Sequence, residues 1–450
     1  MRKSVFPALL IMAAAFTVAA QIKILPMNIK QSTLANGLRV VTLQDNSSPT
    51  VAIHVWYDVG GKDDPLGKSG FAHMFEHMMF KSTKNMPNEK MDRLTEDVGG
   101  FNNASTWPDF TNYYEVVPSN YLETLLWAEA DRMVELNVDD ANFSSERDVV
   151  KEEYRQGVLA NPYGRFYEYL NNLSYQKHPY KRGVIGNLDE LNAATPADAQ
   201  KFYKAFYRPD NAVLIVVGDF DQKQLDGYVD KYFGGIVKPS QPIKRITEAE
   251  PEWTKERRFH EHGPIVPFPA VGITYLAPPA KDADAAALLV AENIMSGGES
   301  SRLYQSLIYR QQLAQEAEFD AEFRLDRGLL KFVAIAAEGK TPEELEKALL
   351  AELALIQKDG PTAQEMEKAK NQLVARAIRG RENNDGKAIV IERAIAYLGD
   401  PTAVNQEIQK IQAVTAADVK RVMQKYFKPD NRVVVYYTQE EKKSTDGGEK

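Results

Sequence analysis

Three polar residues stand in an otherwise apolar stretch of the chain. From Phe71 to Phe80 only His73, Glu76 and His77 are polar, so a helix here is apolar on all sides and is expected to be buried. A buried polar side chain without a partner costs about 1 to 3 kcal/mol, so the three need a shared partner. His73 and His77 are four residues apart and can aim both imidazoles at one point. Two imidazoles at this spacing indicate a zinc site, with Glu76 as general base on a zinc-bound water.

The order His-x-x-Glu-His is the inverse of the common zinc-protease motif. A single buried imidazole is more often only a hydrogen-bonded core residue. The chain, however, has six His in 450 residues, and this pattern would arise by chance in about one such chain in a hundred. The spacing therefore favours a metal site.

Composition limits the other possibilities. The chain is 44% hydrophobic and 26% charged, which is ordinary for a soluble globular protein of two or three domains. Its net charge is -8 without a basic tract, so nothing predicts a nucleic acid or an anionic membrane as partner. Cysteine is absent, which excludes disulfides, thiolate ligands and cysteine nucleophiles. Any metal must be held by histidine and carboxylates.

Residues 1–20 are predicted to be a cleavable signal peptide. Arg2 and Lys3 give a positive start, and an apolar run with small residues at its end precedes Gln21. The run of 16 residues, 5–20, is shorter than the about 20 residues of a membrane span. We expect a mature chain without a stable membrane span that works in the periplasm or is otherwise exported. An uncleaved anchor is the alternative.

A third metal ligand is expected on another helix, which the pattern predicts to begin near Ser145. Glu146 and Glu153 are seven residues apart, so they lie within about 20° of one another on one face, together with the apolar pair 149–150. Glu152 is turned by about 100° from Glu153 and belongs on the solvated side. An open catalytic zinc site needs three protein ligands, and an inward carboxylate completes the set. The alternative for any such glutamate is a solvated charge.

Two β segments precede the metal helix, and another β segment follows it. Leu38 to Leu43 and Val51 to Tyr57 are rich in β-branched and apolar residues and are expected to form two paired strands. Phe101 to Thr106 is a short, polar segment that is poor core material. It suits an exposed sheet edge that pairs with an extended peptide through its backbone. An ordinary loop and edge strand is the alternative.

The two halves of the chain are similar at an offset of 220 residues. Segment 195–211 matches 415–431, and Val51 to Ile53 matches Val271 to Ile273. The repeated units are therefore whole domains rather than short solenoid repeats. The counterpart of the metal helix, near 293–297, contains no His. We expect the second unit to lack a metal site.

The sequence resembles the pitrilysin/insulinase family of zinc peptidases, the inverzincins, and more closely its short bacterial branch, which is similar to the mitochondrial processing peptidase. The resemblance covers nearly the whole mature chain and includes the paired halves. The motif residues that carry it are His73, Glu76, His77, Asn103, Ala104, Thr106, Glu146 and Glu153.

This resemblance implies a role for each site residue. Glu76 is the catalytic base, and Glu146 is a carboxylate that supports the site, as groups behind metal ligands commonly do. Asn103 and Ala104 are the edge-strand residues that hold the substrate backbone. One Zn2+ per chain has three ligands, namely His73, His77 and Glu153.

The fold expected for the chain is α+β, with two homologous domains that are each a mostly antiparallel β-sheet flanked by α-helices. The N-terminal zinc-binding peptidase domain is 21–236, the linker 237–258 and the homologous non-catalytic domain 259–441. The polar tail 442–450 is expected to be disordered.

One departure from the family concerns partners. Active members also use an Arg and a Tyr in the second half, and the matching stretch Gly328 to Glu344 contains neither. In the short branch two chains pair around one chamber, and the second chain can carry these residues. The resemblance therefore implies a heterodimer with a second homologous chain that carries the Arg/Tyr pair. A homodimer is the alternative.

Together these features predict an exported zinc metalloendopeptidase that cleaves peptides or unfolded polypeptide segments in a closed chamber. The alternative is a non-catalytic structural or assembly subunit on the same two-domain scaffold. The intact motif weighs against that alternative.

Overall fold

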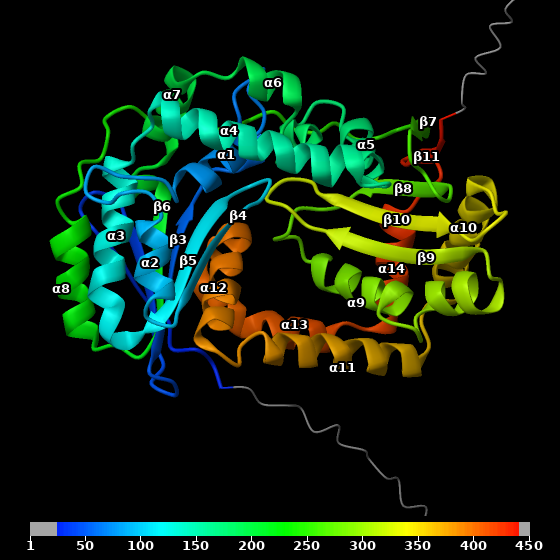
Figure 1. Cartoon of the computed structure of the whole chain (residues 1–450). Coiled ribbons are helices and arrows are strands. Elements are labelled where there is room, and N and C mark those ends of the chain that lie inside the picture. Colours follow the sequence, from blue (N-terminus) through cyan, green and yellow to red (C-terminus); the bar gives the residue numbers. More distant parts are fainter. Residues whose placement is uncertain (1–24, 441–450) are drawn as a thin grey trace, which may run out of the picture.

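A computed structural model describes residues 25–440, so the expected signal peptide and the expected tail from 442 onward lie outside the described residues. Each half of the chain forms one β-sheet with helices packed around it. Figure 1 shows the first half in blue to green and the second half in yellow-green to red. Within residues 25–440, no helix is both long and apolar enough to cross a membrane.

The first sheet has six strands in the order β1-β2-β6-β3-β5-β4. β2 and β6 run parallel, and all other neighbours run antiparallel. The strands are β1 (Lys30–Thr33), β2 (Arg39–Gln44), β3 (Thr50–Tyr57), β4 (Phe101–Thr106), β5 (Thr111–Pro118) and β6 (Ala212–Gly218).

The expected pairing of the first two predicted strands, which are β2 and β3, is wrong, because β6 lies between them. All residues of β6, Ala-Val-Leu-Ile-Val-Val-Gly, are buried. A strand that is apolar on both faces is stable only where both faces are covered, which is the middle of a sheet.

The second sheet has five strands in the order β7-β11-β8-β10-β9. Its one parallel pair, β7 and β11, corresponds to β2 and β6 of the first sheet. The order of the remaining strands corresponds as well, so the expected α+β fold of two homologous, mostly antiparallel units is confirmed. The strands are β7 (Arg257–Gly263), β8 (Ala270–Leu276), β9 (Ala314–Glu322), β10 (Leu329–Ala336) and β11 (Val433–Gln439).

Eight α-helices of the described chain precede β7 and six follow β8. The first group is α1 (Phe71–Met78), α2 (Lys90–Glu96), α3 (Leu122–Glu135), α4 (Asp140–Tyr154), α5 (Gly164–Ser174), α6 (Leu188–Ala193), α7 (Pro196–Phe206) and α8 (Gln222–Phe233). The second group is α9 (Ala285–Ser296), α10 (Pro342–Asp359), α11 (Ala363–Arg379), α12 (Asn384–Leu398), α13 (Glu407–Ala413) and α14 (Ala416–Tyr426).

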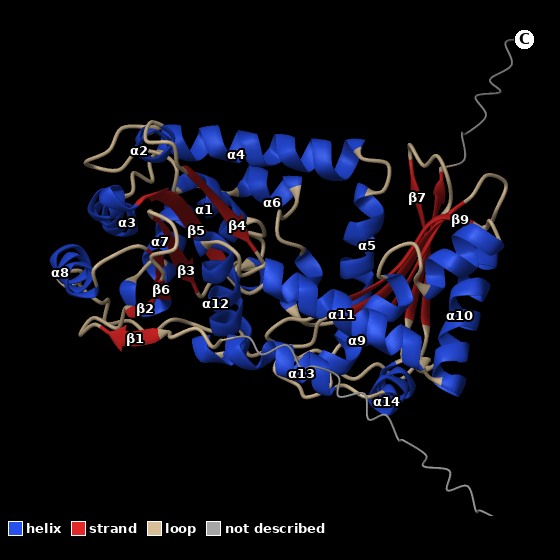
Figure 2. Ribbon diagram, turned by 90° about the horizontal axis from the view of Figure 1, so that it is seen from below, coloured by secondary structure: helices blue, strands red, loops and turns tan. Residues whose placement is uncertain are grey.

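The two halves exchange one helix each. α5 and α12 begin 220 residues apart, and each packs on the sheet of the other half: α5 on β7, β8 and β11, and α12 on β3 and β6. Figure 2 shows both helices against these sheets. At Gly272 in β8, a Cβ atom would lie 2.3 Å from Leu170 Cδ2 of α5, so a larger residue would force the Leu170 side chain to move. The two halves therefore share buried interfaces and are not structurally independent domains.

A buried polar cluster joins α12 to the first sheet. His54 of β3 is fully buried, with Nδ1 3.0 Å from Glu392 Oε2 and Nε2 3.2 Å from Asp385 Oδ1. Asn112 of β5 donates to the same Glu392 oxygen at 3.0 Å. Burial acts to lower the pKa of His54, but the two carboxylates outweigh it and the pKa is raised. When it is protonated, His54 therefore forms ion pairs that join the first sheet to α12.

We expect His54→Gln to destabilise the protein more at low pH than at high pH. Since the folded pKa of His54 lies above the unfolded value of about 6.5, its ion pairs stabilise fully below that value and are lost as the pH rises through the folded pKa. Breaking a buried pair costs about 3 kcal/mol, so urea unfolding at pH 6 should show a loss of this size that shrinks by pH 9.

The control for this experiment is His260→Gln, because His260 is exposed on β7 and should have little effect at either pH. A loss for His54→Gln that is the same at pH 6 and pH 9 would contradict the charged state of the imidazole.

Candidate active site

The position of α1 is fixed at its start and along its length. Gly70 precedes it with φ of 91°, and the buried carboxylate of Asp64 accepts from the N–H groups of Gly70 at 2.6 Å and Ala72 at 2.9 Å. Burial raises the pKa of Asp64 to about 7, although these hydrogen bonds act to lower it. Further along, the Tyr113 hydroxyl of β5 donates to the carbonyl of Phe75 at 3.0 Å. The polar residues of α1 are therefore held in one orientation.

The structure brings His73 and His77 of α1 together with Glu153 of α4. Oε2 of Glu153 lies 3.7 Å from His73 Nε2 and 3.4 Å from His77 Nε2, and one ligand atom from each residue falls within 4.8 Å of the others. Zinc binds its ligands at about 2.0 to 2.1 Å in a tetrahedron, which places neighbouring ligand atoms about 3.3 Å apart. The three side chains therefore fit a zinc ion.

The two imidazoles have different electrostatic surroundings. Burial, with a smaller effect from His77, lowers the pKa of His73 to about 3, so this ring is neutral at pH 7. Burial also acts to lower the pKa of His77, but the carboxylates of Glu146, Glu153 and Glu76 outweigh it and the pKa is raised. A neutral imidazole is the form that binds a metal.

Helix α4 begins five residues earlier than expected, because Asp139 and not Ser145 caps it. The Asp139 side chain accepts from the N–H of Asn142 at 2.8 Å, whereas the Ser145 hydroxyl donates to Glu146 Oε1 at 3.1 Å. The expected start near Ser145 is therefore wrong, and the upstream cap Asp139 determines the start.

The inward face of α4 carries Glu146, Val150 and Glu153. Glu146 and Val150 are buried, and the Glu153 side chain is 43% exposed at the open side of the site. The expected inward position of Val149 is wrong, since it is exposed; it is turned by about 60° from Glu146 around the helix. Glu152 is on the solvated side as expected and pairs with Arg155.

Glu146 lies behind one of the metal-ligand candidates. Its Oε2 is 3.6 Å from His77 Nδ1, and its Oε1 is 2.6 Å from Lys81 Nζ. Burial acts to raise the pKa of Glu146, but its interactions with His77 and Lys81 outweigh it and the pKa is lowered. An ionised Glu146 is thus placed to orient the His77 ring.

Glu76 points to β4. The Thr106 hydroxyl at the end of this strand donates to Glu76 Oε2 at 2.6 Å. Burial raises the pKa of Glu76, and the Thr106 hydrogen bond only partly offsets this. The sequence marked Thr106 only as part of a family motif. Its contact with Glu76 depends on how α1 packs against β4, which no local spacing indicates.

Strand β4 is the last strand of the first sheet, so one of its edges is free. Ala104 is buried and pairs with Tyr113 of β5. Its N–H is donated to the side chain of Asn103 at 2.8 Å and is therefore not used in the bonds between β4 and β5. The outer edge of β4 is thus the side on which an added strand could pair.

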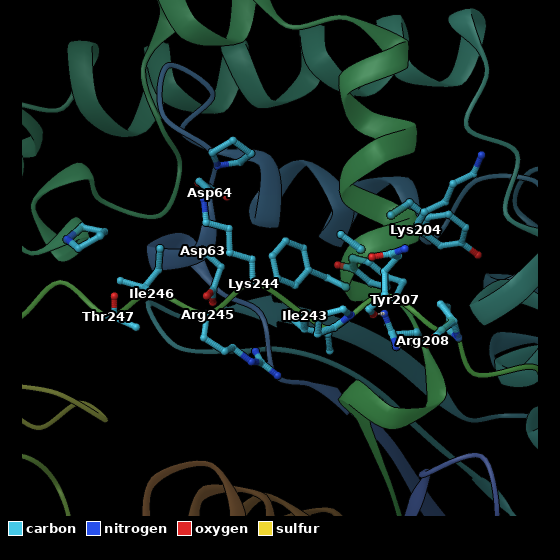
Figure 3. Close-up of a pocket in the computed structure, with 18 of the residues that line it drawn as sticks. Asp63, Asp64, Lys204, Tyr207, Arg208, Ile243, Lys244, Arg245, Ile246 and Thr247 are labelled. Carbon is cyan, nitrogen blue, oxygen red and sulfur yellow. Dashed lines mark hydrogen bonds between the residues drawn. The ribbon is translucent and has the colours of Figure 1, made fainter.

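A cavity of about 1100 Å3 lies away from these residues. It is bounded by the linker residues 236–248, by segment 203–209 and by Asp63 and Asp64, and none of the candidate zinc ligands lines it. Figure 3 shows Lys244 and Ile246 of the linker on one wall and Asp64 nearby. The candidate zinc ligands converge beside β4 and not in this cavity, and within residues 25–440 no second such group is found.

The family model described as "Insulinase (Peptidase family M16)" matches residues 39–187, and the model described as "Peptidase M16 inactive domain" matches residues 193–373. The protein "Zinc protease PqqE" of Helicobacter pylori is 30% identical over 90% of this chain and 91% of its own length. The chain belongs to the insulinase family of peptidases, M16. A probable mitochondrial-processing peptidase subunit beta of Arabidopsis thaliana is 25% identical over 88% of this chain and 75% of its own length.

The M16 fold of this chain is also seen in a solved structure. The crystal structure of a protease from Helicobacter pylori has a TM-score of 0.88 at 30% sequence identity and covers 92% of this chain and 100% of that chain. The "inactive domain" model falls mostly on the half in which α9, the counterpart of α1, carries no His. The three candidate zinc ligands of this M16 chain therefore all lie in its first half.

We expect Glu146→Gln to weaken zinc binding by about 10- to 100-fold, because the partner of His77 Nδ1 loses its charge while the three candidate ligands remain. Glu152→Gln is the matched control, since Glu152 lies on the same helix and faces solvent. Competition with a chelator at fixed pH measures both affinities. Equal affinity in the two variants would rule out a supporting role for Glu146.

Proposed function

We propose that this M16 chain is an exported zinc metalloendopeptidase that hydrolyses peptides or unfolded polypeptide segments in a closed chamber. The observation that carries the proposal is the convergence of His73, His77 and Glu153 beside Glu76 at the free edge of β4. The names of the curated relatives as zinc proteases support it.

His73, His77 and Glu153 would hold one zinc ion, which supplies a Lewis acid that lowers the pKa of a water and stabilises negative charge on the reacting carbonyl. Thr106 holds Oε2 of Glu76 and leaves Oε1 to accept a proton from the attacking water. Glu76 then passes this proton to the leaving amine. Its raised pKa suits this role, because a base works best with a pKa near the working pH.

The substrate backbone would bind as an added strand on β4. Peptides that extend a sheet gain main-chain hydrogen bonds along the free edge, and Asn103 and Ala104 lie in the middle of this edge. Only an extended segment can bind in this way, so the proposed substrates are peptides or unfolded stretches of a protein.

Glu76→Gln is expected to keep zinc and to lose peptide cleavage by at least about 100-fold, since only the base is removed. The test combines metal analysis of the purified variant with an assay on an unstructured peptide. Loss of zinc in this variant, or retained cleavage, would contradict the assigned roles.

The same measurements distinguish the proposed peptidase from the alternative function, a non-catalytic subunit. The description of residues 193–373 as an inactive domain favours that rival mainly for the second half, because the match covers only the end of the first half. A wild-type chain that takes up no zinc and cleaves no peptide, with or without a partner, would establish the rival for the whole protein.

A second homologous chain is part of the proposal. β10 and the segment after it, Gly328 to Glu344, provide neither Arg nor Tyr, so stabilisation of the reacting carbonyl would be incomplete in the isolated chain. A partner would supply these groups and the other wall of the chamber, which excludes bulk water. The relative from Arabidopsis thaliana is named as a subunit, which supports pairing.

Protein purified from its native cell envelope should start near Gln21 and copurify with a similar chain that lacks His-x-x-Glu-His. N-terminal sequencing and the mass in solution measure the two properties together. An intact Met1 in the membrane fraction would contradict export, and a fully active monomer would contradict pairing. A fully active homodimer would be consistent with a closed chamber but would contradict the division of roles between two different chains.

A further inference from the structure

We propose that β4 selects its substrate through two exposed aromatic side chains, Phe101 and Trp107, and so prefers extended peptides with apolar side chains six residues apart. This inference rests on the proposed peptidase function and adds a substrate class to it. It concerns the face of β4 that is opposite to Glu76.

The exposure of these two rings is unusual for this protein. Among residues 25–440, Phe101 is the only exposed phenylalanine, at 47%, and Trp107 is the only exposed tryptophan, at 42%. Solvent-exposed aromatic side chains often mark a binding surface, because aromatic residues contribute much of the binding energy of interfaces. Phe101 is the first residue of the edge strand β4, and Trp107 directly follows its last residue.

The side chains of β4 point alternately to the two faces of the first sheet. Ala104 is buried, Asn102 donates to Thr95 of α2, and Thr106 donates to Glu76 of α1, so the even-numbered residues face the helices. Since successive side chains in a strand point to opposite faces, Phe101 and its odd-numbered neighbours face away from them. Trp107 follows in the same alternation directly after the strand.

Trp107 is held in place before any peptide binds. Its Nε1 donates to the Ser105 hydroxyl at 3.0 Å, and its ring stacks on Phe110 with centroids 6.1 Å apart and planes at 26°. A ring that is already ordered loses little conformational entropy on binding, which favours affinity.

A peptide that pairs with β4 brings its side chains next to those of the strand. Residues directly opposite one another in paired strands lie on the same face, so the peptide residues opposite Phe101 and Trp107 are six positions apart. At about 3.3 Å per residue, the two rings are separated by about 20 Å. The positions between them meet Asn103 and Ser105, which are polar. Because Thr106 contacts Glu76, the cleaved bond lies toward the Trp107 end.

The test uses the zinc-loaded Glu76→Gln chain, together with its partner if one is required, and two labelled unstructured peptides of identical composition. One peptide carries two leucines six positions apart and the other carries them three apart. We expect the six-spaced peptide to bind about tenfold more tightly by fluorescence anisotropy, since only it can contact both rings. Phe101→Ser and Trp107→Ser should each remove most of this preference.

Tyr309→Ser is the control, because Tyr309 is an exposed ring outside β4 and should leave the preference unchanged. Circular dichroism and thermal unfolding show whether each variant is folded, and Phe101→Ser keeps the test valid if Trp107→Ser is not. Equal affinity for both peptides, or an unchanged preference in Phe101→Ser, overturns the inference. A change of mass in solution in Phe101→Ser would also overturn it, because the face would then be a subunit interface.

Failure of this inference can be told from failure of the proposed function. A wild-type enzyme that cleaves both peptides at equal rates refutes only the aromatic selection. A wild-type enzyme that cleaves neither peptide refutes the peptidase proposal itself.

Discussion

The site depends on the burial of α1, a helix that is apolar apart from three residues. His73, Glu76 and His77 can be taken out of water only where other groups receive them, because a buried polar group without a partner is costly. The structure provides two partners for these polar side chains. Glu153 of α4 faces the two imidazoles, and Thr106 of β4 binds the carboxylate. The burial of α1 and the geometry of the polar site therefore depend on the same contacts. A change in the packing of α1 would alter both.

The exchange of α5 and α12 connects this arrangement to the second half. α4 ends at Tyr154, one residue after Glu153, and a π-helical turn, Arg155–Ala160, leads from it toward α5. α5 in turn packs on the second sheet. The position of Glu153 thus depends on contacts of both halves, although none of the candidate zinc ligands found in the described chain lies in the second half. This dependence gives the second half a structural reason to be retained.

The sequence predicted those features of the site that depend on local spacing. His73 and His77 lie one turn apart on α1, and Glu146 and Glu153 share one face of α4, as helical periodicity indicates. The segment from Phe101 forms an edge strand, as its polar composition indicates. The offset of 220 residues likewise predicted two units of the same topology. The inward position of Val149 was wrong, because a helical face is narrower than a run of adjacent residues suggests.

Features that join distant segments could not be predicted in this way. The insertion of β6 between β2 and β3, the cap that Asp64 provides for α1 and the contact of Thr106 with Glu76 all join segments that are far apart in sequence or in different elements. Each of these contacts depends on how the elements pack against one another in three dimensions, which the local sequence pattern does not specify.

The measurement that tests the account most directly is the anomalous diffraction of a zinc-loaded crystal, recorded on both sides of the zinc absorption edge. The account predicts one zinc peak per chain, bound by His73 Nε2, His77 Nε2 and a carboxylate oxygen of Glu153, with Glu76 next to it and not bound. A peak elsewhere, no peak after loading, or a metal bound by Glu76 in place of Glu153 would contradict it.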